Sequence, residues 1–209
     1  MSEYAVHFTK DDATTSAYCV MINILATGQL KASGPFGAAR RLDALGDTQE
    51  AVCFSEIPLD KLDRLVERRS SFGIAFKQGF LVSKGGARVW YVDNEGQVAR
   101  TLRGMVSSRA VPGMDLADDF WKLTPFVDYP SSSYDYRFEW EREWRVPGGL
   151  SFAPDDVAFL FMPGELHATA RSFMQNALHE NTGPGYLCTY LDPEWSDEHL
   201  QGVFEQAQL

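Results

Sequence analysis

The chain has 209 residues, 44% of them hydrophobic and 23% charged, a composition typical of a globular protein with a substantial core. It has no run of about 18 apolar residues and no basic-then-apolar start, so we expect a soluble cytoplasmic protein without a membrane span or signal peptide. Its net charge of −10 argues against general binding to nucleic-acid phosphates.

The charge is unevenly distributed along the chain. Residues 1–56 carry 4 basic and 7 acidic side chains, residues 57–110 carry 10 and 5, and residues 111–209 carry 5 and 17. Two interpretations stay open. The basic middle pairs with the acidic C-terminal half inside the molecule, or a basic face at 61–109 holds a nucleotide or a nucleic-acid strand.

The first half of the chain alternates predicted strands with short helices. The patterns predict strands at 4–10, 51–56, 72–76 and 87–92, an extended segment at 29–33 and a helical turn at 79–82. His7, inside the first strand, should be at least half buried. A helix follows N-cap candidates at 14–16 and ends at Gly28, a second covers 38–45 and carries Arg40 and Arg41, and a third is opened by Pro58.

The second half predicts a similar mixture. Residues 93–104 are compatible with a helix, and 112–130 read as irregular chain anchored by Phe120 and Trp121. A fully apolar strand at 157–162, a strand at 185–190 and a terminal helix capped by Ser196 follow. The helix at 164–180 should turn its apolar side chains inward, namely Leu166, Ala170, Phe173, Met174 and Leu178. We therefore predict one α+β domain over 1–209, with a central mixed or antiparallel sheet flanked by helices.

The stretch 137–146 alternates carboxylates with aromatic and basic residues. As a strand, it places Glu139, Glu141 and Glu143 on one face and Trp140, Arg142, Trp144 and Val146 on the other. One interpretation is a solvated edge strand whose glutamates pair with arginines; the other is a catalytic Glu143 with Glu141 as its neighbour. A helix competes, because Trp140 and Trp144 are four residues apart, but Pro-Gly-Gly at 147–149 favours a strand from Trp144 onward.

The cysteines and histidines lack the spacing of a metal site. Cys19, Cys53 and Cys188 are widely separated and flanked by apolar residues, so we expect reduced, buried thiols. The histidines, at 7, 167, 179 and 199, form no metal motif either. Phosphate-binding loops, dinucleotide fingerprints, nucleophile elbows and Cys-x-x-Cys motifs are also absent from the sequence.

Two resemblances to known families connect the dispersed residues. His7-Phe8-Thr9, with the helix ending Asn23-Ile24-Leu25-Ala26-Thr27-Gly28, resembles the opening of DarT-type ADP-ribosyltransferases, and Glu143-Trp-Arg-Val-Pro147 resembles their catalytic-glutamate strand. The segments 53–59, 72–77 and 85–92 resemble the AbiGi abortive-infection family of phage-resistance proteins. This second resemblance spans about residues 50–165 and is the better one.

The resemblances imply an ADP-ribosyltransferase-like fold and a protein that uses NAD as its substrate. His7, with Thr9 on the same strand, would hold the ribose next to nicotinamide, and Phe54 and Ser55 would line the nicotinamide pocket. Glu143 would stabilise the cationic transition state, which is worth several kcal/mol for a fixed carboxylate in a pocket of low dielectric.

The remaining implied roles fall on a second glutamate and two arginines. Glu141 would orient the acceptor, and either Arg40 or Arg41 would hold a phosphate of the dinucleotide.

Two functions from different classes follow. The first is an NAD-dependent ADP-ribosyltransferase of bacterial phage defence, acting on a nucleic-acid or protein acceptor. The alternative is a non-catalytic, acidic, antitoxin-like protein that neutralises a toxin partner, for which the excess of 12 negative charges in residues 111–209 is the motivation.

Overall fold

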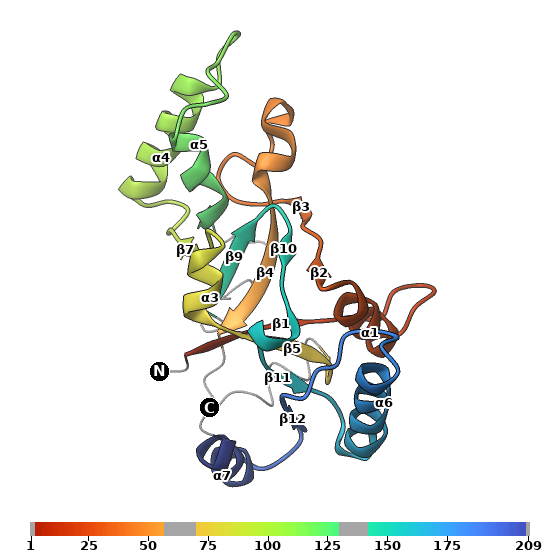
Figure 1. The fold of residues 1–209 in the computed structure, drawn as a ribbon. Helices are drawn as coiled ribbons and strands as arrows, with labels where there is room; N and C mark the ends of the chain where they lie inside the picture. The colour runs from red at the N-terminus through yellow and green to blue at the C-terminus, as the bar shows by residue number, and fades with distance from the viewer. Residues whose placement is uncertain (1–2, 57–69, 130–141, 208–209) are drawn as a thin grey trace. The chain divides into compact units, whose positions relative to one another are not determined.

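A computed structural model describes residues 3–56, 70–129 and 142–207 (Figure 1). The predicted helix after Pro58, and Glu139 and Glu141, lie outside these residues. The chain divides into two compact units. The first comprises Met1–Leu30, Phe54–Leu81 and Ser151–Leu209, and the second Lys31–Cys53 and Val82–Leu150. The prediction of one domain over 1–209 stays a prediction.

The described residues form a mixture of helices and strands, which confirms the α+β class. The α-helices are α1 (Ala17–Thr27), α3 (Gln78–Ser83), α4 (Gln97–Arg109), α5 (Phe120–Leu123), α6 (His167–His179) and α7 (Asp197–Ala207). The strands are β1 (Tyr4–Phe8), β2 (Gln29–Leu30), β3 (Ser33–Pro35), β4 (Glu50–Glu56), β5 (Gly73–Lys77), β6 (Ala87–Arg88), β7 (Trp90–Tyr91), β8 (Val127–Asp128), β9 (Glu143–Pro147), β10 (Leu150–Ser151), β11 (Val157–Phe161) and β12 (Thr189–Leu191). Short 3-10 helices include η1 (Asp43–Gln49) and η3 (Thr124–Phe126). No helix in this described part is long and apolar enough to cross a membrane.

The first unit is built on a mixed sheet with the strand order β12-β11-β5-β1 and then the last residues of β4. β1 pairs antiparallel with β4 and β5, β5 pairs antiparallel with β11, and β12 joins β11 in parallel. The apolar composition of β5 and β11 suits this placement, because both strands are buried on both faces. The prediction of a mixed sheet is confirmed.

The two faces of this sheet are covered by different aromatic clusters. Phe204 of α7 packs edge-on against Phe159, with ring centroids 5.3 Å apart, on the face that Tyr4 shares. The other face carries Phe54 and Phe76, whose rings are 5.9 Å apart. Aromatic pairs in edge-to-face geometry add to the stabilisation that burial already supplies.

Helix α1 begins and ends where its capping residues predict. The Ser16 hydroxyl accepts a hydrogen bond from the backbone N–H of Cys19, and Gly28 adopts the left-handed conformation with φ of 62°. Met21 and Leu25 form its buried face. The helix therefore starts at Ala17 and ends at Thr27, close to the predicted bounds.

The second unit consists of short strands and helices around two small apolar clusters. β9 pairs with β6, β3 pairs with the first residues of β4, and β7 pairs in parallel with β8. One cluster surrounds Trp121 with Ala39 and Leu45. The other joins Ala99 of α4 to Val92 and Val127.

Several local predictions were wrong. Residues 38–41 form turns and a 3-10 helix follows at Asp43–Gln49, where the sequence predicts a helix over 38–45. The strand at 87–92 is broken into β6 and β7, and the segment 112–130 contains α5, η3 and β8. The strand predicted at 185–190 begins only at Thr189.

Two of the side chains expected to point inward from α6 are exposed. Phe173 and Leu178 are 58% and 47% exposed, whereas Ala170, Met174 and Ala177 form the buried face of the helix. Cys19 is exposed as well, because it lies on the outer face of α1, so the expectation of a buried thiol there was also wrong. The three cysteines form no disulfide with one another.

Candidate functional site

A buried network of charged groups lies in the second unit, centred on Arg145 of β9. We call it the Arg145 network and define it by Arg40, Tyr91, Asp128, Glu143 and Arg145. The Arg145 side chain is only 3% exposed, and those of Glu143 and Asp128 are 16% and 13% exposed. Buried charges of this kind require partners, because leaving water is costly for an ion.

The guanidinium of Arg145 satisfies most of its hydrogen-bond donors. It donates to Glu143 through Nε at 2.8 Å and Nη2 at 3.2 Å, to Asp128 through Nη2 at 3.0 Å, and to the carbonyl of Pro125 through Nη1 at 2.6 Å. Its plane also lies over the ring of Phe36, 4.7 Å from the centroid. Two parallel bonds to one carboxylate fix both partners, so Glu143 is held as well as neutralised.

The backbone explains how distant residues reach this arginine. Glu143 and Arg145 are two residues apart on β9 and therefore share a face. The parallel pairing of β7 with β8 sets Tyr91 opposite Asp128, and the backbone N–H of Val89 donates to the carbonyl of Glu143 at 2.8 Å. Local strand geometry thus brings three separate segments together around one guanidinium.

Arg40 joins the network through a tight turn. Gly37 adopts φ of 80°, and a Cβ there would lie 1.9 Å from the carbonyl oxygen of Thr124, so only glycine fits. The next N–H, that of Ala38, donates to the same oxygen at 2.9 Å. Arg40 then donates to Asp128 at 2.7 Å with its side chain 42% exposed, which makes it the solvent-facing end of the network.

The network changes the proton affinity of its neighbours. Burial raises the pKa of the Tyr91 hydroxyl well above its usual value, and the charge of Glu143, to which that hydroxyl donates, raises it further. Burial and then Glu143 likewise raise the pKa of the Cys53 thiol. Burial alone would lower the pKa of Arg145, but the charge of Glu143, its hydrogen bond and the nearby Cys53 and Asp128 together outweigh burial, and the pKa is raised. Tyr91 and Cys53 are therefore neutral and Arg145 is charged at physiological pH.

The chemistry available to this arrangement is limited. Two cations face two carboxylates, so the network as a whole is neutral. A carboxylate that stabilises a developing cation must offer uncompensated negative charge. Glu143 is instead paired with Arg145, and this geometry favours a structural role. Among the described residues no group of three or more His, Cys, Asp or Glu side chains could hold a metal ion.

The predicted site residues are divided between the units. In the first unit, His7 is partly buried as expected, and its ring meets that of Phe54 edge-on at 5.8 Å. Ser55 is buried and lies opposite Val6 in the register, so its side chain is on the other face of the sheet from that of His7. The hydroxyl of Thr9 donates to the carbonyl of Ala17 at 2.8 Å.

In the second unit, Arg40 and Glu143 belong to one network and Arg41 is exposed. Glu141 lies outside the described residues. The predicted NAD site stays a prediction. Sequence reasoning missed Tyr91, Asp128 and Arg145. The spacing of Glu143 and Arg145 on one strand face was the readable signal for the last of these.

Comparison with known proteins places the chain in a family. The family model described as "Putative abortive phage resistance protein AbiGi, antitoxin" matches residues 40–176, more than half of the chain. The chain belongs to the AbiGi family. Searches of curated proteins and of solved structures found no match.

The AbiGi match contains every member of the Arg145 network, from Arg40 to Arg145. It also contains the strands β4, β5 and β11, and it ends within α6 at residue 176. The resemblance inferred from residues 50–165 is therefore confirmed and extends further in both directions. The comparisons do not show the likeness to DarT-type enzymes or the ADP-ribosyltransferase-like fold.

Proposed function

We propose that this chain acts in phage resistance as the antitoxin of an abortive-infection pair, binding and neutralising a toxin protein. The AbiGi match carries the proposal, since the family's description names an antitoxin. The neutral Arg145 network supports it, because the strongest candidate for a catalytic carboxylate is occupied by an ion pair. An antitoxin needs a stable binding surface and no reactive group.

The test is co-expression with a candidate toxin gene taken from the genomic neighbourhood of this chain. Bacteria that make the toxin alone should stop growing, and growth should recover when the chain is present. A co-purified complex should accompany that recovery. Failure of the chain both to restore growth and to bind the toxin would refute the proposal.

Transfer of ADP-ribose from NAD to a nucleic-acid or protein acceptor is the second candidate. It is supported by the meeting of two residues of the expected NAD set, Arg40 and Glu143, in one network although they lie about a hundred positions apart in the chain. In this proposal Arg40 presents its exposed guanidinium to a phosphate. Glu143 acts on the ribose after leaving Arg145.

Nicotinamide release from NAD by the purified protein tests this candidate. Wild type should turn over NAD, and Glu143→Gln and His7→Ala should not. Equal turnover by wild type and both variants would reject it, as would the absence of NAD binding at millimolar concentration. Thermal unfolding of each variant controls for loss of the fold.

A further inference from the structure

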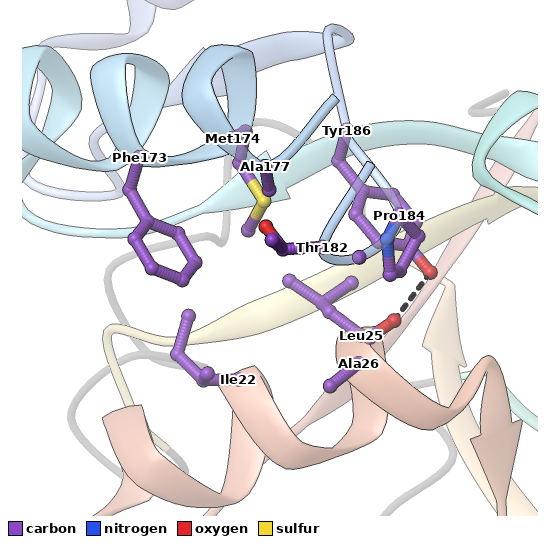
Figure 2. A pocket seen from close by; sticks show the side chains of 10 residues that line it. Ile22, Leu25, Ala26, Phe173, Met174, Ala177, Thr182, Pro184 and Tyr186 are labelled. Atoms are coloured by element: carbon purple, nitrogen blue, oxygen red, sulfur yellow. Dashed lines mark hydrogen bonds between the residues drawn. The ribbon is translucent and has the colours of Figure 1, made fainter. Parts of the chain in front are cut away.

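The first unit contains a mostly apolar cavity of about 130 Å³ between α1, α6 and the segment 182–186 (Figure 2). Its lining residues come from all three elements: Ile22, Leu25, Ala26, Phe173, Met174, Ala177, Thr182, Gly183, Pro184 and Tyr186. The hydroxyl of Tyr186 donates to the carbonyl of Leu25 at 2.8 Å, which ties the segment to the end of α1. This buried bond gives the cavity a fixed wall.

Exposed apolar side chains occur on, or next in sequence to, the segments that line this cavity. Within the described part of the first unit, the strongly exposed large hydrophobic residues are Phe173, Leu178 and Leu187, at 58%, 47% and 54% exposure. Phe173 itself lines the cavity, and Figure 2 shows it on α6 with Ile22 on α1. Leu178 packs beside Gly185, where an added Cβ would lie 2.2 Å from its side chain. Grouped exposed apolar residues typically mark an interaction surface.

The surrounding unit is strongly acidic. Its described residues include 13 acidic and 3 basic side chains, whereas those of the second unit include 10 acidic and 11 basic ones. Most of the excess of negative charge in residues 111–209 therefore belongs to the unit that carries the cavity, because residues 151–209 have 9 acidic side chains and 1 basic one. Such a field attracts a basic partner and raises its association rate.

We propose that Phe173, Leu178, Leu187 and the cavity beside them form the docking site for the toxin, which inserts an apolar side chain from a basic surface. This inference rests on the proposed antitoxin function. A buried apolar anchor surrounded by complementary charge is the usual arrangement of residues that dominate binding energy. The cavity would accept the anchor, and the acidic unit would orient the basic surface around it.

The experiment measures binding of the toxin identified by co-expression, purified, to wild type and two variants by calorimetry. Phe173→Ala removes the exposed ring. Ala26→Phe fills the cavity from an exposed position on α1. We expect each variant to weaken binding by about tenfold or more, and we expect binding to weaken as salt is raised. The control Leu123→Ala truncates a side chain that is 62% exposed on α5 of the second unit, and it should leave the affinity within about twofold.

The outcomes separate this inference from the proposed function. If wild type binds the toxin and both variants bind it equally well, the docking site is wrong and the antitoxin function stands. If wild type does not bind the toxin, both are wrong. Size-exclusion chromatography without toxin supplies the third outcome. A dimer that Phe173→Ala converts to monomer would assign this surface to a second copy of the chain and overturn the toxin site.

Discussion

Replacing Arg145 by methionine tests whether the Arg145 network stabilises the second unit. The substitution keeps an unbranched side chain of similar reach and removes four hydrogen bonds from the guanidinium. Glu143 and Asp128 then remain largely buried without their shared cation. Breaking a buried ion pair from one side costs about 3–5 kcal/mol. At about 2–4 °C per kcal/mol for a chain of this size, the melting temperature should fall by roughly 6–20 °C.

A matched control is available in the same network. Arg40→Met also removes a cation from Asp128, but the Arg40 side chain is 42% exposed and Asp128 keeps its bond to Arg145. Exposed pairs contribute about 0–1 kcal/mol, so this variant should unfold close to wild type. Adding Glu143→Gln to Arg145→Met should recover part of the loss, because it removes one uncompensated carboxylate.

Thermal unfolding followed by circular dichroism, together with urea titration, measures both variants. Two compact units can unfold in separate steps, so each transition is fitted on its own. If Arg145→Met lowers the free energy of unfolding by no more than Arg40→Met does, the reasoning is refuted. Such a result would mean that water or rearrangement compensates the two carboxylates.

Three further predictions follow from buried groups and from one turn. Because the pKa of Tyr91 is raised, the folded protein keeps its proton above pH 10 while the unfolded chain loses it, so stability should fall above about pH 10 by up to about 1.4 kcal/mol per pH unit. In urea titrations at pH 9–11, the free energy of unfolding of Tyr91→Phe should fall less steeply with pH than that of wild type. Equal slopes for the two proteins would contradict this. Cys19 is exposed, whereas burial raises the pKa of Cys188 to about 12, so an aromatic disulfide reagent at pH 8 should modify Cys19 first. Cys19→Ser should abolish that fast phase, and a fast phase that persists would show the assignment to be wrong. Gly37→Ala should cost more than about 1 kcal/mol in thermal unfolding, because the added carbon meets the Thr124 carbonyl at a positive φ, and an unchanged melting temperature would contradict that close approach.

The central strands and the first helix could be predicted because their signals are local. β4 and β11 are apolar runs of strand length, and burial on both faces follows from that composition. The helix α1 has a serine N-cap at Ser16 and a glycine C-cap at Gly28, both of which are among the capping residues predicted from the sequence. In these elements the hydrophobic pattern and the capping residues indicate the same type of secondary structure.

The failures came from tertiary contacts that override local preference. Residues 38–45 contain good helix formers, yet the contact of Gly37 with Thr124 fixes a turn there and Gly46 interrupts the following 3-10 helix with φ of 47°. On α6 the buried face runs through Met174 and Ala177. The sequence analysis predicts that the larger Leu178 points inward, but its neighbour Ala177 occupies the buried position.

Part of the candidate site could be predicted from the sequence. The sequence identifies Glu143 as a candidate. Its two-residue spacing from Arg145 on one strand indicates that the two side chains share a face. The pairing of Tyr91 with Asp128 depends on two-residue strands joined in parallel across 37 positions of the sequence. Such short non-local pairing has no periodicity to detect, so Tyr91 and Asp128 could not be predicted as members of the network.

The first unit is assembled from three segments that are far apart in the sequence. β1 and β5 are synthesised early, but β11 and β12 complete their sheet only after residue 191 has left the ribosome. Contacts over such separations form slowly, because long loops must close before any pairing rewards them. The apolar surface at 173–187 is translated in the same final stretch. The proposed docking site for the toxin is therefore incomplete on the nascent chain. Under the proposed antitoxin function, neutralisation should lag behind translation by the folding time of this unit.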